Sequence, residues 1–107
     1  MAPRKTETTE IDGKSYTLAS LTIGQLRRLR ERTPAAEAAE KAGDPLSLLL
    51  LDAEAIYMAI QRGQGDIGMT LEQFLDVLDD QDFLGAREAA FRLSGMKAQP
   101  PGEQKSP

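Results

Sequence analysis

Residues 10–26, EIDGKSYTLASLTIGQL, place a tight turn and the start of a helix next to one another. Asp12-Gly13 favours a two-residue type I′ turn, because both central residues of that turn have positive φ and glycine adopts positive φ without steric cost. This turn predicts an antiparallel hairpin over residues 7–18. Side chains alternate across a strand, so one face of the hairpin is mostly apolar. The residues of that face are Thr9, Ile11, Tyr16 and Leu18. A two-stranded hairpin is marginally stable alone, so we expect this face either to close a helical bundle or to seat another chain.

A helix is expected to follow the hairpin directly. Thr22 and Gln25 fit a capping box, in which each side chain bonds the backbone N–H of the other residue. Thr33-Pro34 has the form of a cap followed by a proline in the first turn. It predicts that the first helix ends there and that a second, Ala/Glu-rich helix begins.

The longest apolar segment follows Asp44-Pro45, which repeats the cap-then-proline signal, and is expected to form a helix that ends at Gly63. Its apolar residues fall on two sides of the helix. The broader side carries Leu46, Leu49, Leu50, Ala53, Ile56, Tyr57 and Ile60. The other side carries Leu48, Leu51, Ala55, Met58 and Ala59. Such a helix is either the central helix of its bundle or has a side for a partner, and both interpretations stay open. Under the second, the candidate contacts are Leu48, Leu51, Ala55 and Met58.

Two further helices are expected in the second half of the chain. Thr70 and Gln73 form a second capping box, and Asp80 or Asp82 is expected to cap the last helix. Gly95 gives a stop signal. On this last helix Leu84 and Phe91 lie together on a second apolar face, so they join Ile11, Tyr16 and Leu18 of the hairpin as further candidate partner contacts.

Together these elements predict an α+β fold that is mainly α, a small helical bundle preceded by an N-terminal β-hairpin. We expect a single domain over residues 7–95, with its helices within 22–95. Residues 1–6 are expected to form a flexible tail. Residues 96–107 are polar and rich in proline and are expected to be disordered.

The amino-acid composition excludes several classes of function. The chain has 107 residues, no Cys and no His, so the commonest catalytic bases, nucleophiles and metal ligands are missing. We therefore expect a protein that is not an enzyme and holds no cofactor or metal. The net charge of -4 disfavours a general nucleic-acid binder. The Leu48–Leu51 run is far shorter than the roughly 20 residues that span a bilayer, so no membrane is expected as a partner.

Two motifs suggest ligands but lack the surroundings that those ligands require. Residues 63–68 match G-x-G-x-x-G, but a dinucleotide fingerprint needs a preceding strand, and here a helix is expected before it. The arginines between Arg27 and Arg32 spread around most of a helix, which favours a solvated surface over a phosphate-binding stripe. A small DNA-binding regulator that uses these arginines remains an alternative.

The order of the parts resembles a known family. Residues 10–29, EIDGKSYTLASLTIGQLRRL, and residues 69–95, MTLEQFLDVLDDQDFLGAREAAFRLSG, resemble the two halves of tail assembly chaperones from long-tailed bacteriophages. The resemblance implies binding to the tape measure protein, which the chaperone would keep soluble while helping to recruit tail tube protein. It also implies action in the host bacterial cytoplasm and absence from the mature virion. No binding residue is carried over by position. A homo-oligomer, in which copies of the chain are partners of one another, stays open, and a structural head–tail adaptor is a second alternative function.

Overall fold

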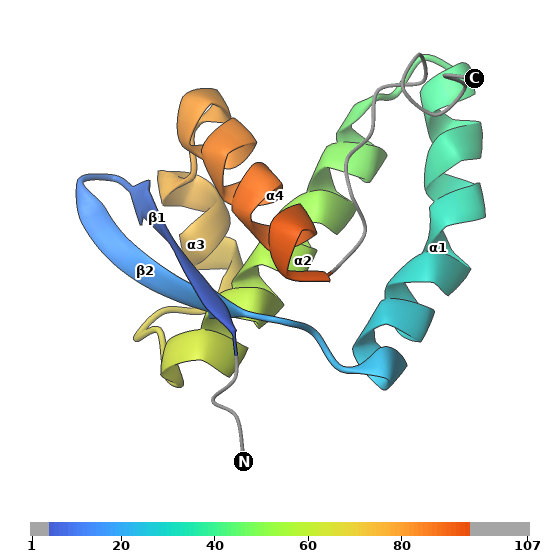
Figure 1. Cartoon of the computed structure of the whole chain (residues 1–107). Helices are drawn as coiled ribbons and strands as arrows, with labels where there is room; N and C mark the ends of the chain where they lie inside the picture. The colour runs from blue at the N-terminus through green and yellow to red at the C-terminus, as the bar shows by residue number, and fades with distance from the viewer. Residues whose placement is uncertain (1–4, 95–107) are drawn as a thin grey trace, which may run out of the picture.

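The fold is α+β and mainly α, with an N-terminal hairpin followed by helices, as predicted (Figure 1). It has four helices over the described residues, one fewer than predicted, because the first two predicted helices form one. The computed structural model describes residues 5–94, so the predictions for residues 1–4 and 95–107 lie outside it. The elements are β1 (Thr6–Ile11), β2 (Lys14–Ala19), α1 (Ile23–Lys41), α2 (Leu46–Gln64), α3 (Leu71–Val77) and α4 (Asp80–Ser94). Thr6, assigned to the tail from the sequence, pairs with Ala19 and extends the hairpin by one residue at each end.

The hairpin has the predicted turn and register. Asp12 and Gly13 both have positive φ, at 54° and 77°, and Ile11 pairs with Lys14 across the turn. Ile11 and Leu18 are fully buried, and Tyr16 is 6% exposed. Their face closes the helical bundle, with β1 lying along α4 and β2 along α2 (Figure 1). The prediction that Ile11, Tyr16 and Leu18 contact a partner is therefore wrong, because the helices of the same chain cover them.

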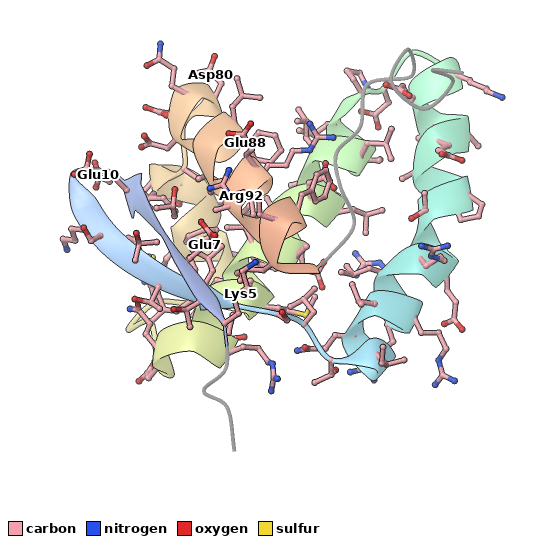
Figure 2. The ribbon with its side chains drawn as sticks, viewed as in Figure 1. Lys5, Glu7, Glu10, Asp80, Glu88 and Arg92 are labelled. Carbon is pink, nitrogen blue, oxygen red and sulfur yellow. The ribbon has the colours of Figure 1, made fainter. Side chains whose placement is uncertain are left out.

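Polar contacts fasten the hairpin to α4. The backbone N–H of Asp12 donates to Oδ2 of Asp82 at 2.9 Å, which ties the turn to the first turn of the helix. Near the other end of the helix, Arg92 and Glu7 form an ion pair at 3.1 Å, and Figure 2 shows the two side chains facing each other. The first strand and the last helix are thus joined at both ends.

Helix α1 does not break at Thr33-Pro34, contrary to the prediction. It runs without interruption from Ile23 to Lys41, and the capping box of Thr22 and Gln25 begins it as expected. The hydroxyl of Thr33 donates to the carbonyl of Leu29 at 3.1 Å, inside the helix, so it caps nothing. Pro34 costs the helix one backbone hydrogen bond. Leu29 before the proline and Ala36 after it are both at least half-buried, and we attribute the continuity of the helix to packing on α2 on both sides of Pro34.

Helix α2 continues through Gly63, where the sequence predicted its end. It finishes at Gln64, and Gly65 with φ 86° follows it. A Cβ atom on Gly63 would clash with the carbonyl oxygen of Thr17 and would lie 2.7 Å from the Thr17 carbonyl carbon and 2.8 Å from that of Leu18. Glycine at this position therefore lets the backbone of β2 pack directly on the helix. The amide of Thr17 also donates to Oε1 of Gln64 at 2.7 Å.

The second half of the chain forms a short helix and a longer one. The predicted capping box of Thr70 and Gln73 is present at the start of α3. The cap of α4 is Asp79, whose Oδ1 accepts from the amide of Asp82 at 2.8 Å, so the prediction of Asp80 or Asp82 is wrong. The carboxylate of Asp82 instead accepts the hydrogen bond from the hairpin turn.

Candidate docking groove

An apolar groove runs between α1 and α2 and reaches α4 and the connection between β2 and α1. Its volume is about 280 Å³. The residues that line it are Ala19, Ser20, Leu21, Leu26, Leu29, Arg30, Thr33, Leu48, Leu51, Asp52, Ala55, Ala59, Ala90 and Phe91. We call it the α1–α2 groove.

The position of α1 creates this groove. Helix α1 packs mainly against α2 and stands away from the hairpin and from α3 (Figure 1). Its polar links to α2 are an ion pair between Arg32 and Glu54 at 2.9 Å and a contact of 3.8 Å from Nε2 of Gln25 to Sδ of Met58. On the α2 side, Ala55 has only a methyl group, too small to fill the space between the two helices.

Charged side chains lie at one border of the groove. Arg87 pairs with Asp52 at 3.0 Å, and its guanidinium carbon lies 5.0 Å from the centre of the Phe91 ring. Burial raises the pKa of Asp52, and this effect outweighs the opposing influence of Arg87. Arg87 thus connects α2 to α4 and stacks on one of the aromatic residues that line the groove.

The structure brings together part of the predicted partner surface. Leu48, Leu51, Ala55 and Phe91 all line the α1–α2 groove, although Leu51 is only 8% exposed. Met58 is half-buried beside Gln25 and lies outside the lining. Leu84 is 61% exposed and also lies outside it.

The sequence did not indicate that α1 supplies the opposite wall. Leu26, Leu29 and Thr33 face the groove from α1. The spacing of Leu26 and Leu29 is a helical apolar stripe, and this was the available signal, but Ile23 on the same stripe is 80% exposed. The packing of α1 on α2 is needed to see that Leu26 and Leu29 line the groove and that Ile23 does not.

A second apolar depression lies where the first turns of α2 meet the corner between α3 and α4. Leu46, Leu49 and Leu50 are 55%, 46% and 42% exposed there, although the sequence placed them on the broader apolar side of the helix with core residues. Helices α3 and α4 do not cover the start of α2, so these leucines remain at the surface. The depression has a volume of about 250 Å³ and is also lined by Ala53, Leu75, Leu78, Asp79, Asp80 and Phe83. We call it the corner groove.

Other ligand sites find little support over residues 5–94. This part of the chain holds no cluster of three or more residues suited to binding a metal ion, and none of its helices is long and apolar enough to cross a membrane. In the G-x-G-x-x-G match, Gly63 lies inside α2, so a helix and not a strand precedes the loop. Of the arginines in α1, Arg32 pairs with Glu54 and Arg27 approaches Glu31 at 4.0 Å.

Comparisons of the chain with protein-family models, with curated proteins and with solved structures give no match.

Proposed function

We propose that this chain is a non-enzymatic tail assembly chaperone of a long-tailed bacteriophage, and that it binds an apolar helical segment of the tape measure protein in the α1–α2 groove. The observation that carries the proposal is this open groove, built from leucine, alanine and phenylalanine side chains of three helices. The resemblance of residues 10–29 and 69–95 to that family supplies the identity of the client.

The lining suits a helix that presents apolar side chains at i, i+3 and i+4. Leu29 and Leu48 come from opposite walls, and Ala55 leaves room for a client side chain between them. Burying one client leucine contributes roughly 1.5–3 kcal/mol before the costs of ordering the partners. Because the lining has few polar groups, recognition depends on apolar surface more than on sequence. Such recognition suits a chaperone that must cover many segments of one long client.

The client is then kept soluble until tail tube protein assembles around it, in the host bacterial cytoplasm. A chaperone of this kind leaves before the virion is complete, whereas a structural head–tail adaptor stays. Mass spectrometry of purified virions separates the two functions, and recovery of the chain in stoichiometric amounts from finished particles would favour the adaptor.

The groove is tested by co-expression of the tagged chain with the tape measure protein. Leu48→Glu places a carboxylate in the groove at a half-buried position, so we expect a folded protein that no longer co-purifies with the client. Leu51 is a poorer choice, since at 8% exposure its replacement by Glu tests folding more than binding.

Leu84→Glu is the matched control, because it makes the same change at an exposed helical position outside the groove. Circular dichroism checks the fold of both variants. A folded Leu48→Glu variant that retains the client as well as the wild type contradicts the proposed site. Loss of the client with Leu84→Glu alone would move the site to the outer face of α4.

A further inference from the structure

The corner groove combines exposed leucines with negative charge. Two acidic residues, Asp79 and Asp80, line the groove, and no Lys or Arg occurs between residues 63 and 86. Over residues 5–94, Asp79 and Asp80 form no ion pair. Asp80 lies at the outer end of α4 (Figure 2). An occupant of this groove therefore needs an apolar side chain beside positive charge.

The same chain carries such a surface on the first half of α1. Ile23 is 80% exposed, and Arg27 and Arg30 follow it on the same side of the helix at i+4 and i+7. Arg27 has only an exposed, 4.0 Å approach to Glu31, which is a weak pairing. The aliphatic stems of the arginines extend the apolar surface that begins at Ile23.

We propose that a second copy of the chain docks the Ile23 and Arg27 side of its α1 into the corner groove. The first turn of α1 and the first turn of α4 lie at opposite ends of the molecule (Figure 1), so one copy does not pair the two surfaces within itself. The contact is heterologous and joins copies head to tail, which gives open chains or closed rings. Both members of the complementary pair occur on this chain, and this favours a second copy over a foreign basic helix.

The two proposals are tested at different residues. Ile23, Arg27, Leu49 and Asp80 lie outside the lining of the α1–α2 groove, whereas Arg30 belongs to that lining and adjoins the docking side of α1. The variants below leave the lining unchanged, so failure of one proposal leaves the other intact.

Sedimentation velocity of the purified full chain tests the contact. The wild type should self-associate as its concentration rises, and the association should weaken when salt increases from about 0.05 M to about 0.5 M. Arg27→Glu and Asp80→Lys each block one end of the molecule, so each variant alone should associate at least about tenfold more weakly. Leu49→Glu tests the apolar part of the same groove.

Mixing Arg27→Glu with Leu49→Glu gives the decisive result, because the two altered surfaces are both negative and repel each other. The intact α1 of Leu49→Glu meets the intact corner groove of Arg27→Glu, so the mixture should form dimers that grow no further. Lys14→Glu and Glu10→Lys reverse exposed charges on the hairpin and should associate like the wild type. Circular dichroism verifies that every variant is folded.

Three results overturn the proposal. The first is a wild type that stays monomeric at every concentration at low salt, which leaves the corner groove to a foreign basic helix. The second is blocked variants that associate as strongly as the wild type. The third is a mixture that remains monomeric.

Discussion

Replacing Gly63 by alanine adds one methyl group where α2 meets the backbone of β2. In an ordinary helix interior this change stabilises the protein by roughly 1 kcal/mol, because alanine has the higher helix propensity. Here the added Cβ would lie 2.7 Å from the carbonyl carbon of Thr17 and 2.8 Å from that of Leu18. These atoms belong to the backbone, so no side-chain rotation relieves the clash.

The size of the effect follows from these distances. Carbon atoms pack best at about 3.5–4.0 Å, so β2 must move away from α2 by about 0.8 Å or more. That displacement loosens the packing of Leu18 and Tyr16 on the helix. Overpacking of this kind costs about 1–3 kcal/mol, which outweighs the gain in propensity. We expect a net loss of up to about 2 kcal/mol and a thermal midpoint lower by up to roughly 16 °C.

Thermal and urea unfolding followed by circular dichroism measure this loss. Gly85→Ala is the matched control, because Gly85 is exposed within α4 and the nearest atom to its added Cβ, Oγ1 of Thr9, is at an ordinary 3.9 Å. Gly85→Ala should leave stability unchanged or raise it by up to about 1 kcal/mol. If both variants behave alike, β2 does not approach α2 closely enough for a methyl group at residue 63 to separate them.

Three further substitutions test separate features by thermal unfolding. Gly13→Val should cost about 1 kcal/mol or more, because Gly13 has φ 77°, which a β-branched residue tolerates poorly, and an unchanged midpoint would contradict the turn. Tyr57→Phe should cost about 1 kcal/mol, since it leaves the carbonyl of Met69 without the 2.7 Å hydrogen bond from the Tyr57 hydroxyl, and a neutral result would show that water replaces it. Burial raises the pKa of Asp52, so the folded state binds its proton more tightly than the unfolded chain, and stability should fall as pH rises from the unfolded to the folded pKa. Asp52→Asn should abolish that dependence and be at least as stable at neutral pH, whereas a clear loss would mean that the ion pair with Arg87 dominates.

The features that could be predicted from sequence depend on residues close together in the chain. The Asp12-Gly13 turn fixes a register within a few residues of itself, and each capping box joins residues three apart, as Thr22 and Gln25 show. Pro34 and Gly63 were misread because packing between elements, which no local pattern shows, decides whether the helix continues through each of them. Packing on α2 carries the helix past Pro34, and the nearby strand explains a glycine inside α2.

The same limit applies to the candidate site. The two-sided pattern of α2 identified Leu48, Leu51 and Ala55 as one wall of the groove. The opposing wall comes from α1 and Phe91 from α4, and no local pattern says which helices meet. The exposure of Leu46 likewise depends on how far α3 and α4 extend along α2, which is a property of the whole fold.

The attachment of the hairpin to α4 has a consequence for folding during translation. Glu7 pairs with Arg92, and the backbone of Asp12 bonds to Asp82, so both contacts need residues that are synthesised much later. Strand β1 therefore leaves the ribosome long before its partner helix does. A two-stranded hairpin is marginally stable alone, and during that interval α4 is not yet available to cover its part of the apolar face, although α2 is. Closing the core therefore depends on contacts of high sequence separation, which form slowly. A ribosome that stalls before residue 80 leaves a nascent chain in which the part of this face that α4 covers is open to solvent, a substrate for proteolysis or aggregation, whereas synthesis of α4 closes the fold.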